Sequence, residues 1–348
     1  MPVGDQSPKP LLRARAPLRV SFAGGGTDVP PYPAEEGGLV LSATINRYAY
    51  GTLRQREDRQ IGIQSLDLDV VASIALEDAR PDGDPLDLVK AAIQKLAADS
   101  PNGFDLFLHS AAPPGSGLGS SSAVVVTLVG LLSTHMNTPL TDYERARLAY
   151  TVERQDLGLK GGTQDQYAAV FGGFNFMEFR EDEVIVNPLR IPAETINELE
   201  YNLLLCFTGK TRVSDHIIDD QTTRYRAHEA STTDALRMQK ELAVEMKNAL
   251  LQGNLTEFGN LLDRAWTSKK KMSPRISNEH IDELYAEAKR NGALGGKVTG
   301  AGGGGYMLLY CRYDTKHKVQ AALAALGAEA VDFQFDHTGL TTWSHQDD

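Results

Sequence analysis

Cysteine is nearly absent from this sequence. Only Cys206 and Cys311 occur among 348 residues, and each lies beside apolar residues that resemble strands. Such a pair fits reduced, buried thiols better than a disulfide or a metal site. Neither cysteine is therefore a candidate for catalysis.

Long apolar runs are also missing. The longest, Ala123 to Leu132, contains Thr127 and is far shorter than the roughly 20 residues of a membrane-spanning helix. The start of the chain lacks the apolar region and the cleavage site of a secretory signal, and residues 1–10 resemble a polar tail. We therefore expect no membrane span and a cytoplasmic protein.

Basic residues are too few to balance the acidic ones. The chain has 35 lysine and arginine residues against 46 aspartate and glutamate residues, which gives a formal net charge of −11. Binding to a nucleic-acid backbone needs a basic face, and the sequence shows no basic stripe. A nucleic-acid partner is therefore not expected, and any anionic ligand must be held by local donors.

What the sequence does contain is a mixture of strand-like and helix-like segments without a repeat. Its 348 residues predict about two domains. From about Glu198 the pattern changes to one strand followed by long charged helices. We therefore predict an N-terminal domain over 1–198 and a C-terminal domain over 199–348, in an α/β (α+β) fold, with a boundary uncertain by about four residues.

The individual segments follow from hydrophobic periodicity and from turn residues. Helices are expected over 86–98, 120–136, 142–158, 163–171, 216–271 and 278–291. Strands are expected over 12–23, 39–53, 72–76, 104–110, 201–209, 297–300 and 306–312, with a hairpin around Arg180 to Asp182.

The stretch PPGSGLGSSSA at 113–123 stands between a predicted strand and an apolar helix. Amide groups of a glycine-rich turn and of the first turn of a helix can point together at an anion, and phosphate suits such a site. A tight turn that caps a core helix explains the glycines equally well. Under the phosphate interpretation, the ATP-binding residues are Pro114, Gly115, Ser116, Gly117, Leu118, Gly119, Ser120, Ser121 and Ser122.

Three blocks in order resemble the signatures of the GHMP kinases. They are RVSFAGGGTD at 19–28, PPGSGLGSSSA at 113–123 and KVTGAGGGG at 297–305. The resemblance spans nearly the whole chain and implies a two-domain GHMP kinase fold, with nucleotide and substrate in the cleft between the domains.

Within this superfamily the chain most resembles the sugar-1-kinases that act on D-glycero-D-manno-heptose 7-phosphate. The supporting segments are AGGGTDVPPY at 23–32, LGLKGGTQDQYAAVFGGFNF at 157–176, FTGKTR at 207–212 and RISN at 275–278. Galactokinase-like members carry Glu-His where this chain has Gly25 and Gly26, which argues against galactose as the substrate.

The resemblance implies catalytic and metal-binding residues. Asp165 matches the catalytic aspartate and Arg19 the arginine beside it, although a first-turn acid and a solvated arginine are the ordinary alternatives. Glu153 matches the acid that holds Mg²⁺ together with a serine, here Ser121. Glu153 precedes Asp165 by one residue more than in mevalonate kinase-like members.

The resemblance also implies a substrate site. Asp28 matches the acceptor of a sugar hydroxyl, with the alternative of a simple turn residue. A second phosphate on the sugar needs a further cationic pocket, for which Lys210, Thr211 and Arg212 are candidates and Arg212 is preferred. The lysine run 269–271 is either a second candidate or a solvated helix end. The predicted substrate-binding residues are Gly25, Gly26, Thr27, Asp28, Gly162, Lys210, Arg212, Gly302 and Gly303.

The sequence thus predicts an enzyme that uses ATP and Mg²⁺ to phosphorylate the anomeric hydroxyl of D-glycero-D-manno-heptose 7-phosphate, giving the 1,7-bisphosphate. The alternatives are a kinase for a fucose-like sugar or another sugar phosphate, and a sensor that binds ATP and sugar without turnover. Small-molecule sugar phosphate and ATP are the expected partners, and a homodimer is left open.

Overall fold

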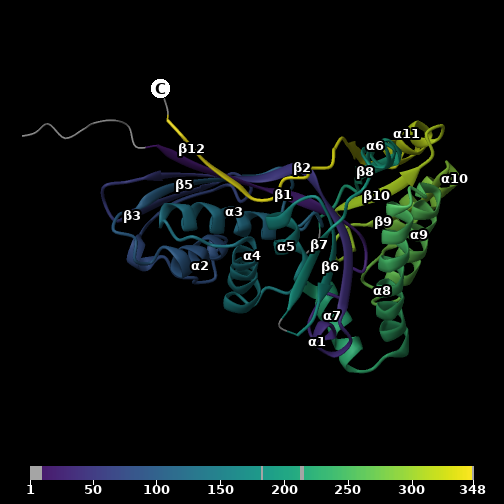
Figure 1. Cartoon of the computed structure of the whole chain (residues 1–348), viewed down its shortest axis with the longest axis horizontal. Helices are drawn as coiled ribbons and strands as arrows, with labels where there is room; N and C mark the ends of the chain where they lie inside the picture. The colour runs from purple at the N-terminus through teal and green to yellow at the C-terminus, as the bar shows by residue number, and fades with distance from the viewer. Residues whose placement is uncertain (1–9, 182, 212–214, 347–348) are drawn as a thin grey trace, which may run out of the picture.

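The structure, a computed structural model, describes residues 10–346 except 182 and 212–214. Within these residues the strands form two sheets (Figure 1). The first sheet contains β1 (Leu11–Ala23), β2 (Gly38–Gln55), β3 (Gln60–Ser65), β4 (Val70–Ala75), β5 (Phe104–Ser110), β6 (Phe174–Phe179), β7 (Val184–Pro188) and β12 (Thr341–His345). The second contains β8 (Leu203–Phe207), β9 (Ala293–Val298), β10 (Tyr306–Cys311) and β11 (Glu329–Val331).

The order of the strands is β12-β1-β2-β5-β3-β4 in the first sheet and β11-β8-β10-β9 in the second. The long strand β2 pairs with two different strands along its length. Its first half pairs with β6 and its second half pairs with β5. All pairs are antiparallel except β3 with β5. The first part of the chain therefore builds a largely antiparallel sheet around β1 and β2.

Helices cover one face of the first sheet and stand beside the second. The helices are α1 (Tyr32–Glu36), α2 (Asp87–Leu96), α3 (Ser120–His135), α4 (Asp142–Tyr150), α5 (Gln164–Phe171), α6 (Ala193–Asn202), α7 (Asp215–Arg226), α8 (Ala230–Leu251), α9 (Leu255–Lys269), α10 (Glu279–Arg290) and α11 (Lys316–Ala325). Figure 1 shows α2, α3 and α4 on the same side of the first sheet, and α8, α9 and α10 beside the second sheet.

Helix α3 is the central helix of the first layer. It packs against β1 and β2 on one side and against α2, α4 and α5 on the other. The apolar run seen in the sequence lies inside this helix, and its one polar interruption is satisfied because the Thr127 hydroxyl donates to the Ala123 carbonyl at 2.8 Å. This burial fixes the start of α3, which carries the three serines of the glycine-rich stretch.

The last strand returns to the beginning of the chain. β12 pairs antiparallel with β1, so that Trp343 faces Arg13 in the register (Figure 1). The two sheets divide between Pro188 and Leu203, an interval that contains residue 198. The boundary at residue 198 stays a prediction, and the C-terminal strand lies in the first sheet although it follows that boundary.

The expectation of reduced, buried cysteines is confirmed. Cys206 and Cys311 are free and buried on neighbouring strands, and burial raises the pKa of each thiol to about 12. No helix in the described part of the chain has the length and apolar character needed to cross a membrane.

Candidate active site

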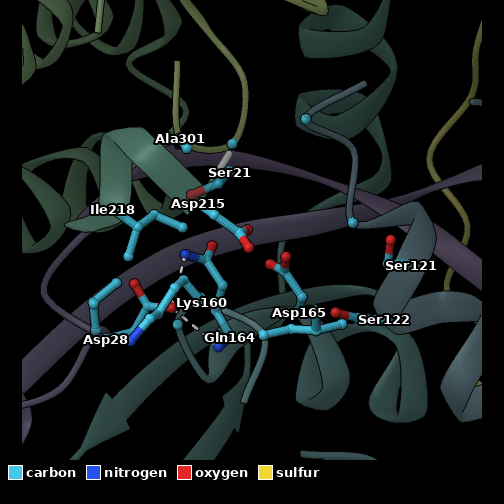
Figure 2. Close-up of a pocket in the computed structure, with 18 of the residues that line it drawn as sticks. Ser21, Asp28, Ser121, Ser122, Lys160, Gln164, Asp165, Asp215, Ile218 and Ala301 are labelled. Carbon is cyan, nitrogen blue, oxygen red and sulfur yellow. Dashed lines mark hydrogen bonds between the residues drawn. The ribbon is translucent and has the colours of Figure 1, made fainter. Parts of the chain in front are cut away.

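A cleft of about 460 Å³ opens where β1, α3, α5, α7 and α9 approach one another (Figure 2). Its lining residues come from both sides of residue 198, so the cleft lies between the two predicted domains. The predicted site residues that line it are Arg19, Gly25, Gly26, Asp28, Pro114, Gly115, Gly117, Gly119, Ser120, Ser121, Ser122, Glu153, Gly162 and Asp165.

The glycine-rich stretch forms one wall of the cleft. Gly115, Gly117 and Gly119 all have φ between 74° and 82°, a left-handed backbone that side chains disfavour. Gly119 is the N-cap residue of α3, and none of the described side chains caps this helix start. The amide groups of the first turn are therefore free to bind an anion, and the serine hydroxyls stand beside them.

A second glycine loop packs against the first. A Cβ atom on Gly117 would lie 2.6 Å from the Thr299 carbonyl oxygen, and one on Gly300 would lie 2.7 Å from the Gly117 Cα. The glycines of the third sequence block therefore permit the close approach of two loops, one from each predicted domain.

Replacement of Gly117 by alanine is expected to lower the free energy of unfolding by about 2 to 5 kcal/mol, because a left-handed alanine is strained and its Cβ meets the neighbouring loop. Denaturation followed by circular dichroism measures this loss, and we also expect a higher KM for ATP. The matched control is Gly327→Ala, since Gly327 has φ 85° and nothing within 4 Å of its added Cβ. Equal losses in the two variants would show that the contact between the loops contributes nothing.

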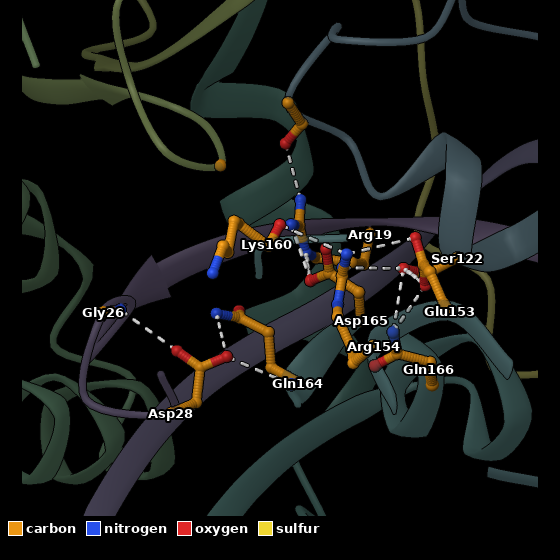
Figure 3. Close-up of polar contacts among 12 residues, drawn as sticks. Arg19, Gly26, Asp28, Ser122, Glu153, Arg154, Lys160, Gln164, Asp165 and Gln166 are labelled. Carbon is orange, nitrogen blue, oxygen red and sulfur yellow. Dashed lines mark hydrogen bonds and ion pairs between the residues drawn. The ribbon is translucent and has the colours of Figure 1, made fainter. Parts of the chain in front are cut away.

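An ion pair lies at the start of α3. The Arg19 Nη2 is 2.7 Å from Asp165 Oδ1, and the Nε donates to the same oxygen at 2.8 Å (Figure 3). Arg19 also donates through Nη1 to the Gly117 carbonyl at 2.6 Å. One arginine on β1 thus holds both the glycine-rich loop and the first-turn carboxylate of α5.

Asp28 is buried at the other end of the cleft. Its Oδ1 accepts a hydrogen bond from the Gly26 amide at 3.1 Å, and its Oδ2 accepts from the backbone and side-chain nitrogens of Gln164 at 3.1 and 3.0 Å (Figure 3). A carboxylate has about four acceptor positions, so one remains for a ligand hydroxyl. Gly162 lies against this carboxylate, because a Cβ there would be 1.9 Å from Oδ2.

Glu153 lies next to Ser122, in a segment where the expected α-helix becomes a π-helical turn. We predicted one helix over 142–158, but α4 ends at Tyr150 and a π-helical turn follows over Thr151–Asp156. A π turn accommodates one extra residue in a helix. Glu153 lies within this turn, and its side chain accepts a hydrogen bond from the Ser122 hydroxyl.

The Glu153 carboxylate is held by polar groups in a dry environment. Its Oε2 accepts from the Ser122 hydroxyl at 2.7 Å and from Gln166 Nε2 at 2.6 Å, and Oε1 lies 3.4 Å from Arg154 Nη1. Burial raises the pKa of Glu153, since these partners only partly offset the loss of water. The serine nearest Glu153 is thus Ser122, whereas Ser121 faces the cleft.

These donors suit a magnesium ion that arrives with a nucleotide. Mg²⁺ prefers oxygen ligands and commonly takes one or two carboxylates together with substrate phosphates. Glu153 supplies a buried carboxylate, and Ser121 and Ser122 supply hydroxyls at the same end of the cleft. The residues present therefore fit Mg²⁺, and the assignment of Glu153 and Ser121 as its ligands stays a prediction.

Several predicted residues lie away from the main cleft. Ser116 and Leu118 are buried behind the loop, and the Thr27 hydroxyl donates to the Gly24 carbonyl at 2.8 Å. Lys210 and Gly303 line a separate cavity beside Asn278 and His280, while Gly302 packs against Ile276. Arg212 lies outside the described residues.

Some cleft residues were not among the predicted site residues. The Arg154 guanidinium donates to the Lys160 carbonyl at 3.2 Å and lies next to Glu153. Ser21 and Gln164 also line the cleft, and so does Lys269, which the sequence offers only as part of the lysine run 269–271. Arg154 and Gln164 directly neighbour predicted residues in the sequence, which was the available signal, whereas nothing local marks Ser21.

The arrangement combines three capabilities in one cleft. Free amides and hydroxyls at the start of α3 suit phosphate groups, and the Asp165 carboxylate beside Arg19 can accept a proton. Asp28 can orient a hydroxyl-bearing ligand at the far end. Such a set suits phosphoryl transfer, which depends mainly on positioning and on charge neutralisation.

Comparison with known proteins agrees with this geometry. Family models for the GHMP kinases N terminal domain and the GHMP kinases C terminal match residues 87–173 and 246–331. The D-glycero-alpha-D-manno-heptose 7-phosphate kinase of Campylobacter jejuni is 38% identical over 336 residues, which cover 95% of this chain and 98% of that protein.

Solved structures show the same two-domain fold. A D-glycero-D-manno-heptose 1-phosphate kinase from Bacteroides thetaiotaomicron has a TM-score of 0.80 and 37% identity, with coverage of 95% of this chain and 98% of the other. The galactokinase of Lactococcus lactis complexed with galactose has a TM-score of 0.76 at 22% identity, covering 96% and 95% of the chains, which is a likeness of fold. This chain belongs to the GHMP kinases.

Proposed function

We propose that this sugar kinase transfers the γ-phosphoryl group of ATP to the anomeric hydroxyl of D-glycero-D-manno-heptose 7-phosphate, giving the 1,7-bisphosphate and ADP. The observation that carries the proposal is the Arg19–Asp165 ion pair at the start of α3, in one cleft with Asp28. The similarity to the Campylobacter jejuni protein named as a heptose 7-phosphate kinase supports this choice of sugar.

The proposed transfer forms one phosphorus–oxygen bond, breaks another, and moves one proton. The anomeric oxygen attacks the γ-phosphorus, the bond from that phosphorus to the bridging oxygen of ADP breaks, and the hydroxyl proton passes to Asp165. The Arg19 guanidinium, 2.7 Å away, holds the Asp165 carboxylate in position before the transfer. The amides at the start of α3 hold the phosphates of ATP.

The remaining residues position the two substrates. Asp28 accepts a hydrogen bond from a sugar hydroxyl and so orients the ring. Glu153, with the hydroxyl of Ser121 or Ser122, would hold Mg²⁺, which when bound neutralises charge on the β- and γ-phosphates.

The phosphate on carbon 7 needs a cationic partner away from Asp165. Lys210 meets this requirement because it lines a cavity that shares Thr211 with the main cleft. His280, Asn278 and Gly303 line the same cavity and offer further polar groups. We assign this cavity to the distal phosphate, with Lys210 as its principal cation. A cytoplasmic location and a homodimer remain predictions.

The substrate is tested by measuring ADP release with heptose 7-phosphate, heptose, fucose and galactose. We expect kcat/KM for the 7-phosphate to exceed that for unphosphorylated heptose by about 10²-fold, the effect of one or two charge-assisted hydrogen bonds. Equal values for heptose and its 7-phosphate would refute the proposed substrate. Binding of sugar and ATP without any ADP release would favour a sensor.

A further inference from the structure

The three lysines of the run 269–271, at the end of α9, lie in different environments. Lys270 is partly exposed and its Nζ donates to Asp282 at 3.0 Å. Lys271 lines a surface groove between α8 and α9. Lys269 is buried, with 4% of its surface exposed, and lines the main cleft. Only one of three adjacent lysines therefore faces the candidate active site.

The Lys269 ammonium group has unused hydrogen-bonding capacity. Its Nζ donates to the Gly300 carbonyl. Among the described residues, no carboxylate lies within ion-pair distance of this nitrogen. An ammonium group has three protons, so two remain for a ligand in the cleft. A buried cation without a full set of partners is costly unless a ligand completes its environment.

Two further buried polar groups near Lys269 have no partner. The Ser21 hydroxyl and the Gln164 Oε1 make no hydrogen bond with any described residue. A Cβ on Gly25 would lie 3.4 Å from Ser21 Oγ, 3.7 Å from Gln164 Nε2 and 3.7 Å from Lys269 Nζ. These side chains therefore surround a small space above the bare backbone of Gly25, at the edge of the cleft that Asp28 occupies.

We propose that Lys269 binds the sugar by donating a hydrogen bond to a ring hydroxyl that Asp28 also contacts, with Ser21 and Gln164 completing a hydroxyl-binding pocket above Gly25. The inference rests on the proposed function, because it takes the acceptor to be a sugar. A hydroxyl group both donates and accepts, so it can give its proton to Asp28 and receive one from Lys269.

The pocket accounts for the absence of a side chain at Gly25. Gly25 does not have a left-handed φ, so its backbone does not require glycine. Even a Cβ would take up part of the space between Ser21, Gln164 and Lys269. The glycine therefore keeps room for a ligand group instead of relieving backbone strain.

The charges that face Lys269 come from several elements. The pKa of Lys269 is lowered to about 8, mainly by burial and also by Arg19, while Asp28 and Asp165 partly offset this shift. Lys297, buried on β9, also lies near this ammonium, and burial together with Lys269 lowers the pKa of Lys297 well below its usual value. Lys269 is therefore charged at neutral pH and loses its proton as the pH rises through about 8, so sugar binding weakens above that pH.

The test compares Lys269→Met with Lys270→Met, using the best sugar that the wild-type enzyme accepts in the substrate panel. We expect Lys269→Met to raise the KM for the sugar by about 10-fold to 100-fold, as for loss of one charged hydrogen bond, and the KM for ATP by less than about twofold. The wild-type rise of sugar KM above about pH 8 should disappear in this variant. Lys270→Met should match the wild type.

Choosing the sugar from the panel separates the two hypotheses, because failure of heptose 7-phosphate as substrate leaves the Lys269 comparison intact. The inference would be overturned if Lys269→Met raised the KM for the sugar and the KM for ATP equally, or if it lowered kcat alone. It would also be overturned if the sugar KM of the variant kept the pH dependence of the wild type. If Lys269→Met does not fold, Gly25→Ala is the second variant, and it must raise the sugar KM without raising the ATP KM. An unchanged sugar KM in Gly25→Ala would contradict the pocket.

Discussion

Replacing Asp165 by asparagine is expected to lower kcat by about 10³-fold, within the range found for loss of a general base. Asparagine keeps the shape of the side chain but cannot accept the hydroxyl proton, and it leaves the Arg19 guanidinium without its counter-charge. The change acts on the transition state, so KM for ATP and for the sugar should change little. Steady-state ADP release at saturating substrates measures the effect.

The control for this variant is Asp156→Asn. Asp156 lies at the end of the π-helical turn and pairs with Lys95 at 3.1 Å, with 37% of its side chain exposed. A surface ion pair of this kind contributes little, so the control should keep wild-type activity. If Asp165→Asn retained activity within about tenfold of the wild type, Asp165 would not be the base.

Much of the fold was predictable because its elements carry strong local patterns. The alternating run at 104–110 is β5, and the apolar stretch from Ser120 is α3. The predicted helical region 216–271 consists of three helices, α7, α8 and α9. It breaks at His228, which has positive φ without a strong stop signal, and at Gly253, where the Gly-Asn pair ends one helix and caps the next and was a local signal that the prediction missed.

Other elements could not be read from the sequence because they depend on distant partners. β12 is short, and it forms by pairing with the free edge of β1 near the other end of the chain, with Leu11 opposite His345 and Leu12 opposite Ser344. β3 likewise gains its place from parallel pairing with β5. Strand propensity depends strongly on context, so tertiary pairing decides such short strands.

The candidate site likewise contains some residues that local sequence patterns identify and others that only tertiary packing identifies. The glycine loops were found because left-handed backbone and close contact demand glycine, which leaves a visible mark in the sequence. Lys269 could not be separated from Lys270 and Lys271 by pattern, since a basic run at the end of a helix is usually solvated. Only the packing of α9 against β9 determines which lysine is buried.

Replacing Glu153 by glutamine is expected to lower kcat by about 10³-fold at limiting Mg²⁺, because a metal ligand contributes several kcal/mol to the transition state. Glutamine retains the shape of the side chain and can still accept the hydrogen bonds from Ser122 and Gln166. The apparent Mg²⁺ requirement should rise, and excess Mg²⁺ should restore part of the activity. Titration of Mg²⁺ at fixed ATP measures this change.

The same variant tests the electrostatics without ATP or metal. Burial raises the pKa of Glu153 in the folded protein above its value in the unfolded chain, so the folded state prefers the protonated acid. The ionised carboxylate therefore costs stability once the pH has risen through the folded pKa, and this cost is absent below the unfolded pKa, near pH 4. Glu153→Gln should thus melt at a higher temperature than the wild type at neutral pH.

The difference in melting temperature should shrink as the pH falls toward about 4, where both side chains are neutral. The control is Glu183→Gln, because Glu183 is exposed in the hairpin between β6 and β7 and its charge is solvated in both states. A constant difference at all pH values would mean that packing, and not charge, separates the variant from the wild type. If the variant were stabilised but needed no more Mg²⁺ than the wild type, Glu153 would not be a ligand of Mg²⁺. The serines at the start of α3 would then bind the ion without help from this carboxylate.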